Sequence, residues 1–325
     1  MKLKFSRKLR ILTFSLIATL AAIFCLYLYE TKDTRQFEQL SQDLLYTELS
    51  GNTISLHYTL AYPENYGLSA DPILPSSFTD VDTRAQVTEW QRRLSCIDPP
   101  KLDPQDRYAY LLFDRFLALT LEGSDFTYYT DPLSPSSGMV SGLPVLLADY
   151  TFRTKKDVED YLGILEQTGA YFDALIRYEQ EKSSAGLFMS DTSADNVIEQ
   201  CDSIMDPVLL KDGSHFLQQT FTERLDGLAS DEIITGEEKQ QYIDKNNLLL
   251  TTVMAPAYER VGDAFLVLKG TGTNPYGLCY YPEGKEYYTY LLAQTTGSSR
   301  SIPEIRRLLE KDYQKNFHAL RDLVK

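Results

Sequence analysis

The strongest helical signal in the chain is the segment TKKDVEDYLGILEQTGAYFDALI, residues 154–176. Thr154 is a typical N-cap residue, and Asp157 stands three positions later, where its carboxylate can complete a capping box. After these two residues, large apolar side chains recur every three or four positions, which is the spacing of one helix face. We therefore predict a long amphipathic helix. Its apolar stripe contains Val158, Tyr161, Leu165, Phe172, Leu175 and Ile176, whereas Glu159, Glu181 and Lys182 take the other side.

Four further segments combine the same spacing with helix start and stop signals. Prolines at the first helical position and glycines beyond the last turn mark their limits. We expect Pro256 to kink or divide the third of these helices. The segments are 104–123, which follows Asp103; 197–205, which stops at Asp206-Pro207; 236–270; and 301–325, which opens with a capping box of Ser301 and Glu304.

Only two short segments alternate between apolar and polar residues with the period of a β-strand, 54–60 and 145–152. Loops rich in proline and serine at 63–77, 98–104 and 131–144 are interpreted as connections within a compact domain. The predicted class is therefore mainly α, a multi-helix ectodomain with these two segments as a possible small β hairpin. One N-terminal transmembrane helix completes it.

The N-terminus predicts that transmembrane helix. A basic head over residues 1–10 precedes residues 11–29, which contain no ionisable acid or base. At about 1.5 Å of rise per residue, this run covers roughly 28 Å, close to the thickness of a bilayer's hydrocarbon core. Because positive flanking charge stays on the inner side, residues 1–10 should be cytoplasmic and 30–325 extracytoplasmic. We predict a single-pass protein of the cell membrane.

A cleaved signal peptide or a lipid-modified cysteine is the competing interpretation of the same region. A signal peptide has a shorter apolar run that ends in small residues, and this run ends in Leu-Tyr-Leu-Tyr-Glu. Cys25 would be the lipidated residue, but Phe24 precedes it where a lipoprotein signal requires a small side chain. An uncleaved anchor is therefore favoured.

Composition excludes some classes of function. The chain has a formal net charge of −14 and an isoelectric point near 4.7, which argues against nucleic-acid binding because that needs clustered Lys and Arg. Hydrophobic residues make up 43% of the chain, enough for a substantial core. Besides Cys25 there are Cys96, Cys201 and Cys279, widely spaced and odd in number, so one disulfide among them and buried free thiols both stay open.

Local motifs for catalysis are missing. His57, His215 and His318 each lack another His or Cys at i+3 or i+4, so no helix-borne zinc pair forms locally, although distant residues could assemble a site. No Gly-x-Ser-x-Gly elbow occurs. The segment 270–277 is rich in glycine but lacks the Gly-Lys-Ser/Thr ending of a phosphate loop, so no nucleotide is expected. We therefore predict no catalytic residue and no metal ligand in this chain.

The most unusual local chemistry lies between residues 277 and 300, where tyrosines gather around two turn glycines and Pro282. A tyrosine ring with its hydroxyl suits contact with a peptide or a sugar. The simpler alternative is that most of these rings pack a helix face. The predicted substrate-binding residues are Tyr280, Tyr281, Tyr287, Tyr288, Thr295 and Thr296.

Several motifs resemble a bacterial family known as domain of unknown function 885, whose members are thought to be zinc-peptidase-like. They are LSPSSG at 133–138, LPVLLADY at 143–150, FRTKKDVEDYL at 152–162, and residues 277–305 with their Pro-x-Gly, Tyr-Tyr and Thr-Thr elements.

The resemblance implies a helical zinc peptidase whose C-terminal half carries a His-Glu-x-x-Pro-Gly-His helix and a further acidic ligand. This chain contains neither and resembles the N-terminal half. We therefore expect a scaffold that contributes part of a peptide cleft, is inactive alone, and meets zinc only with a C-terminal half. Its expected partners are the membrane through residues 11–29, a peptide substrate, and that other half. A cleft built from two halves leaves apolar surface bare when one is absent, so the isolated chain should self-associate or be unstable.

Two alternatives remain. The chain could be a non-catalytic exported module that binds a peptide or a glycan through its tyrosine-rich turn, or a purely structural surface domain.

Overall fold

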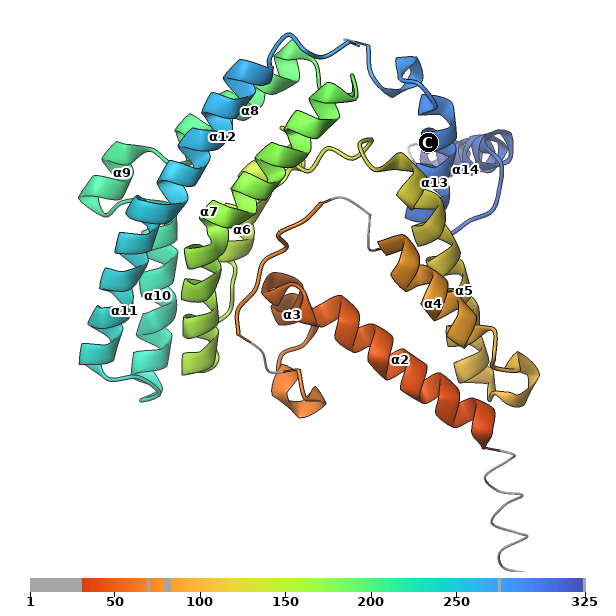
Figure 1. Ribbon diagram of the computed structural model, residues 1–325, viewed down its shortest axis with the longest axis horizontal. Helices are drawn as coiled ribbons and strands as arrows, with labels where there is room; N and C mark the ends of the chain where they lie inside the picture. Colours follow the sequence, from red (N-terminus) through yellow and green to blue (C-terminus); the bar gives the residue numbers. More distant parts are fainter. Residues whose placement is uncertain (1–30, 69–70, 79–82, 274–275, 324–325) are drawn as a thin grey trace, which may run out of the picture. The chain divides into compact units, whose positions relative to one another are not determined.

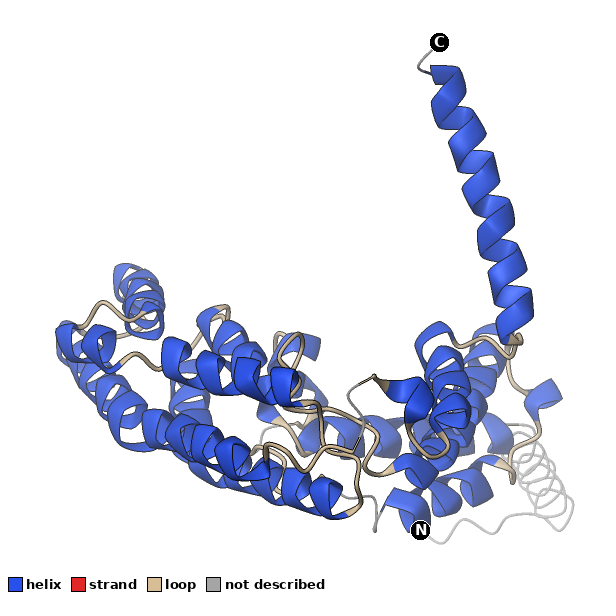
Figure 2. Cartoon of the chain, turned by 90° about the horizontal axis from the view of Figure 1, so that it is seen from above, coloured by secondary structure: helices blue, strands red, loops and turns tan. Residues whose placement is uncertain are grey.

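The computed structural model describes residues 31–323 apart from 69–70, 79–82 and 274–275, and all regular structure in these residues is helical (Figures 1 and 2). The predicted mainly α class is therefore confirmed. The longer helices are α2 (Lys32–Ser50), α3 (Thr53–Thr59), α4 (Thr83–Leu94), α5 (Pro104–Gly123), α6 (Met139–Ala148), α7 (Lys155–Ser184), α8 (Asp191–Ile204), α9 (Pro207–Asp212), α10 (Phe216–Ser230), α11 (Gly236–Leu249), α12 (Ala255–Leu268), α13 (Gly284–Thr296) and α14 (Ile302–Leu323). Short 3₁₀ turns are η1 (Pro63–Tyr66), η2 (Pro99–Lys101), η3 (Ser124–Phe126) and η5 (Leu278–Tyr280).

The chain divides into two compact units that interleave along the sequence. Unit 1 contains the residues up to Leu45 together with Asp82–Leu121, and unit 2 contains Tyr46–Val81 and Glu122–Lys325. Helix α2 therefore continues past the division of the sequence at Leu45.

Unit 1 is built by α4, α5 and most of α2 around its own apolar cluster. Asp33 is buried and accepts a hydrogen bond from the backbone N–H of Asp98 at 2.9 Å, which lowers the pKa of its carboxyl group. Arg93 pairs with Asp43 at 2.7 Å and so ties α4 to α2. The buried cluster contains Phe37, Leu40, Val87, Leu94, Ile97, Leu102 and Leu117.

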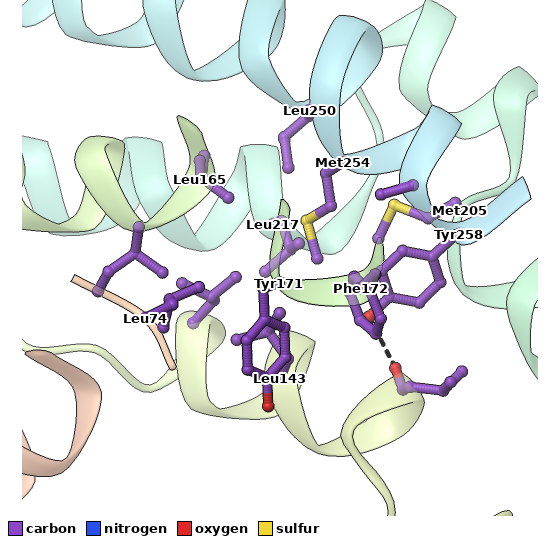
Figure 3. Packing of buried hydrophobic residues seen from close by; sticks show 14 of the residues in the cluster. Leu74, Leu143, Leu165, Tyr171, Phe172, Met205, Leu217, Leu250, Met254 and Tyr258 are labelled. Carbon is purple, nitrogen blue, oxygen red and sulfur yellow. Dashed lines mark hydrogen bonds between the residues drawn. The ribbon is translucent and has the colours of Figure 1, made fainter. Parts of the chain in front are cut away.

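Unit 2 has a larger core, and α7 runs through it (Figure 3). The predicted stripe of α7 is confirmed: five of its six residues are at most 1% exposed, and only Ile176 is partly buried. Figure 3 shows Phe172 beside Tyr258 of α12, and the two ring centroids are 4.9 Å apart. One large core therefore holds α6, α7, α8, α10 and α12 together.

The predicted helix starts are confirmed by their caps. The Thr154 hydroxyl accepts the N–H of Asp157 at 3.4 Å, and the Asp157 carboxylate accepts the N–H of Thr154 at 2.8 Å. Asp103 accepts the N–H groups of two following residues, each at 2.8 Å. The Glu304 carboxylate accepts the N–H of Ser301 at 2.9 Å. Each of these side chains satisfies backbone donors that a helix start leaves free.

The strand alternative was wrong at both segments. Residues 54–59 lie in α3, because the Asn52 side chain accepts the N–H groups of Ile54 and Ser55 at 3.0 and 3.2 Å and starts a helix there. Residues 145–148 are the end of α6, and the chain then leads without a strand into α7. No hairpin occurs in the part of the chain that the structure describes.

Helix α6 tolerates an internal proline through a contact from another helix. Pro144 has no N–H, so it cannot bond to the carbonyl of Val140 four residues earlier. The buried hydroxyl of Tyr258 donates to that carbonyl at 2.8 Å instead. The proline thus creates an acceptor that fixes α12 against α6.

The helical segment is interrupted just before Pro256, as predicted, but it is not broken. A π-helical turn, η4 (Leu250–Met254), joins α11 to α12, and Pro256 lies in the first turn of α12. Because a π turn is wider than an α turn, it absorbs an additional residue without breaking the helix.

The predicted basic head and anchor, residues 1–29, lie outside the described residues. In the described ranges, no helix combines the length and the apolar character needed to cross a bilayer. The cysteines Cys96, Cys201 and Cys279 are free thiols, and only Cys201 is buried.

Candidate functional site

The structure brings together two of the six predicted substrate-binding residues. Tyr287 of α13 is 7% exposed, and Tyr281 is half-buried directly after η5. Tyr280 and Tyr288 are exposed, at 66% and 45%. The other two are exposed at the end of α13, where the Thr296 hydroxyl donates to the carbonyl of Leu292 at 2.6 Å; these two are Thr295 and Thr296.

Tyr281 and Tyr287 belong to a cluster of five rings, which we call the tyrosine cluster. The ring of Tyr129 lies 6.2 Å from Tyr281 and 5.0 Å from Tyr287, measured between centroids. Phe126 lies 5.3 Å from Tyr287 and 5.5 Å from Tyr290. The loop that follows α5 therefore packs directly against α13.

Two hydroxyl groups of this cluster donate hydrogen bonds to backbone carbonyls of the chain. Tyr129 donates to the carbonyl of Pro282, and Tyr281 donates to the carbonyls of Leu187 and Phe188 at 3.4 and 3.3 Å. Burial raises the pKa of Tyr281 and of Tyr287, so both stay protonated. The packing alternative describes these two rings well.

Glycines shape the turn that presents the cluster. Gly277 has φ of +92°, a conformation that favours glycine. A Cβ added at Gly284 would lie 1.9 Å from the carbonyl oxygen of Leu278. Glu283, between them, itself adopts a positive φ of 52°. Helix α13 can start against η5 only because Gly284 has no side chain.

A buried carboxyl group lies in α7, on the part of the helix that contacts the loop containing Thr127, Thr130 and Asp131. Glu179 is 0% exposed, and neither of its carboxyl oxygens has a hydrogen-bond partner. The pKa of Glu179 is raised to about 7, chiefly by burial; Lys182 lowers it and Asp131 adds a smaller upward contribution. Glu179 and Asp131 in turn contribute to the raised pKa of Tyr281, which places the carboxyl group near the tyrosine cluster.

Lys182 follows Glu179 by three residues and is also buried, at 1% exposure. Its ammonium group donates to the carbonyl of Thr130 at 2.7 Å and pairs with Asp131. The Tyr178 hydroxyl donates to the carbonyl of Thr127 at 2.7 Å. The prediction that Lys182 lies on the solvent side of α7 was therefore wrong: its side chain is buried, and the loop supplies a carbonyl and the half-exposed carboxylate of Asp131 as partners for its ammonium group.

This arrangement gives Glu179 a definite chemical capacity. Near neutral pH the group is close to the midpoint of its titration, so it can take up or release a proton. Its two oxygens can accept hydrogen bonds that no described residue makes, and unmet capacity of this kind is rare in native interiors. A donor group from a ligand or a bound water would be stabilised there.

Sequence reasoning missed Glu179 and Lys182, although the pattern contained a signal. Glu179 follows Leu175 by four residues and Phe172 by seven, and Lys182 follows Leu175 by seven. Both therefore fall on the apolar stripe of the helix. A charged residue on a core-facing stripe indicates a buried ionisable group.

A second buried ionisable group, His57, joins α3 to the start of α7. Its ring stacks on Tyr150 with centroids 3.6 Å apart, and its Nε2 accepts the N–H of Thr151 at 3.2 Å. Its Nδ1 lies 3.6 Å from the Asp157 carboxylate. Burial lowers the pKa of His57 to about 4, although Asp157 raises it, so the ring is neutral at physiological pH. Both ring nitrogens therefore contact neighbouring groups and fix α3 against the start of α7.

The described residues do not fit a zinc site. Within them, no three His, Cys, Asp or Glu side chains lie close enough together to hold a metal ion. The hollow of about 660 Å³ beside Met205, Pro256 and Tyr258 also contains none of the predicted substrate-binding residues.

Comparison with known proteins identifies the family. Residues 73–325, more than three quarters of the chain, match the model of the family described as "Bacterial protein of unknown function (DUF885)". The chain belongs to this family. No curated protein matches the sequence.

A solved structure has a similar fold. It is described as "The crystal structure of the putative lipoprotein from Colwellia psychrerythraea", with a TM-score of 0.69 and 18% sequence identity. The similarity covers 85% of this chain and 48% of that one, so this chain spans about half the length of the similar protein. At this level of identity, the likeness shows the fold alone.

Proposed function

We propose that the chain is the exported, membrane-anchored N-terminal half of a zinc-metallopeptidase-like protein, and that it contributes scaffold and part of a peptide cleft. The observation that carries the proposal is the comparison of lengths: a chain with this helical fold covers only 48% of the similar lipoprotein. In this proposal the other half provides the metal and its ligands. No step through zinc involves the residues described here.

The tyrosine-rich turn is the part of the chain suited to line the cleft. Tyr276 and Tyr280 are 75% and 66% exposed, and their ring centroids are 5.3 Å apart. Tyr288 adds a third exposed ring from α13. Exposed rings can stack on the side chains and peptide planes of a bound peptide. Tyr287 and the other rings of the tyrosine cluster pack together beneath this exposed surface and support it.

The proposal is tested first on the native protein from the cell. An antibody against the exposed surface of α11 should detect a membrane protein, or a tight complex, of roughly twice the 37.1 kDa of this chain. Metal analysis of that material should find one zinc per protein. A native product of 37.1 kDa with no associated half would rule the proposal out.

A second candidate is a non-catalytic module that binds peptide or glycan through the same exposed rings. The pair formed by Tyr276 and Tyr280 favours it, because two neighbouring exposed rings form a stacking platform without any metal. Under this candidate, the chain alone binds peptide or oligosaccharide in the presence of a chelator. Tyr280→Ala should abolish that binding, whereas the control Tyr62→Ala, at another exposed tyrosine, should leave it unchanged.

A further inference from the structure

Helix α14 exposes an apolar face along its whole length. It extends from Ile302 to Leu323, none of its residues is buried, and Figure 2 shows it as one continuous helix. Large apolar residues recur along it every three or four positions, which places them on one face. They are Leu308 at 50% exposure, Leu309 at 65%, Tyr313 at 64%, Phe317 at 49%, Leu320 at 61% and Leu323 at 84%.

The opposite face of α14 is polar. Arg307, Lys311 and His318 follow one another at helical spacing on that side. Arg306 pairs with Glu310 at 3.0 Å within the helix. One face thus suits water and the other suits a protein interior, and an uncovered stripe of this size marks an interaction surface.

The family match shows that this helix is part of the common fold. The matched range continues to residue 325 and includes all of α14. The helix that carries the apolar stripe therefore lies within the matched range and not in an appended segment. In the similar lipoprotein, about half of the chain has no counterpart in this one.

We propose that the apolar face of α14 is the docking surface for the other half of the family's fold, through a helix of that half that packs along Leu309, Tyr313 and Phe317. From Ile305 to Leu320 the stripe covers about 22 Å, the length of a three- to four-turn helix contact. This inference rests on the proposed function in one respect, that a second half exists. It adds where that half binds and by what chemistry.

The test is cross-linking in the native protein. The photo-reactive residue p-benzoylphenylalanine replaces Leu309 or Phe317 in the full-length gene product, which is irradiated in its own cells and analysed by peptide mass spectrometry. We expect cross-links to a helix in the part of the family's fold that this chain does not span, either in the same polypeptide or in a separate one. The matched controls place the same residue at Arg307 or Lys311 and should lose the cross-link.

Other occupants of the face would overturn the inference. Cross-links from Leu309 and Phe317 to a second copy of the chain or to lipid, or no cross-link at either position, contradict it. Because all four positions are exposed, the substitutions should leave the helical circular dichroism spectrum unchanged. Zinc content measured on the same material separates the two proposals: zinc without the cross-link defeats the docking surface alone, and the cross-link without zinc defeats only the peptidase.

Discussion

Glu179 makes the stability of unit 2 dependent on pH. Its pKa is raised from 4.5 to about 7, so the folded state holds the proton more tightly than the unfolded state. The resulting stability is fully present below pH 4.5 and is lost as the pH rises through 7. Over that window the raised pKa corresponds to about 3 kcal/mol of unfolding free energy.

Glu179→Gln should remove this dependence, because the amide stays neutral at every pH. We expect the variant to gain stability over the native protein as the pH rises from 5 to 8, measured by urea unfolding at each pH. Glu159→Gln is the control, because Glu159 lies exposed on the same helix. Parallel pH profiles for the native protein and Glu179→Gln would contradict the assignment.

Sequence reasoning at the residue scale found the tyrosines but could not rank them. Tyr281 and Tyr280 are neighbours with similar sequence context, yet one is half-buried and hydrogen-bonded while the other is exposed. The difference comes from Phe188, whose carbonyl lies far away in the sequence. The pairing of buried Lys182 with Asp131 likewise depends on a loop that no local pattern places.

Helix α13 depends on a single glycine at its start. A side chain at Gly284 would collide with the backbone carbonyl of Leu278, which cannot move away as a flexible side chain can. We expect Gly284→Ala to lower the free energy of unfolding by about 1–3 kcal/mol, as overpacking generally does. It should also weaken the near-ultraviolet circular dichroism signal of the tyrosine cluster.

The matched control is Gly227→Ala in α10. A Cβ at Gly227 meets nothing within 4 Å, and alanine is the better helix former by about 1 kcal/mol. This variant should be at least as stable as the native protein by urea unfolding. Equal destabilisation by both substitutions would show that the contact with Leu278 has no special role.

For whole helices, local signals were sufficient to predict where a helix begins when a capping residue was followed by an apolar stripe. Asp103-Pro104, Thr154 with Asp157, and Ser301 with Glu304 each mark a helix start that the structure confirms. The segments 54–60 and 145–152 misled because a short apolar segment does not separate the period of a strand from that of a helix. In α6 the buried residues, Val140, Leu143, Pro144 and Leu147, follow helical spacing. Pro144 itself disfavours a helix because it leaves the carbonyl of Val140 without its helical donor. The hydroxyl of Tyr258, which is distant in sequence, donates to that carbonyl instead.

At the scale of the whole molecule, the membrane attachment separates two interpretations of the N-terminus. If residues 11–29 are an uncleaved anchor, Cys25→Ser should leave the protein in the membrane fraction after alkaline extraction. An N-terminal tag should remain on the protein and be protected from protease added outside, while residues 30–325 are digested. Cys96→Ser is the control, because that thiol is exposed and distant in sequence from the anchor.

A lipoprotein would behave differently in the same experiment. Loss of the tag together with release of Cys25→Ser from the membrane would show lipidation at that cysteine. Lipidation of a cysteine is the attachment expected of a lipoprotein, which is how the similar Colwellia protein is described.

The two-unit organisation could not be read from the sequence. Nothing in the composition of residues 46–81 distinguishes them from their neighbours, yet Ile54 and Leu74 belong to the core cluster of unit 2, with α7. Leu74 also donates its N–H to the side chain of Gln167 at 3.0 Å. Such a partner far along the chain leaves no periodic signal.

This interleaving has a consequence for biosynthesis. A chain emerges from the ribosome N-terminus first, so every residue of unit 1 has emerged once Leu121 is outside. Residues 46–81 then form a loop whose two ends are held by unit 1. Ile54 and Leu74 stay exposed to solvent until α7, Lys155–Ser184, has been synthesised and can bury them. Closing that loop is a long-range step, so folding of the second unit should be slower than folding of the first, and it is the stage at which a chaperone is most needed.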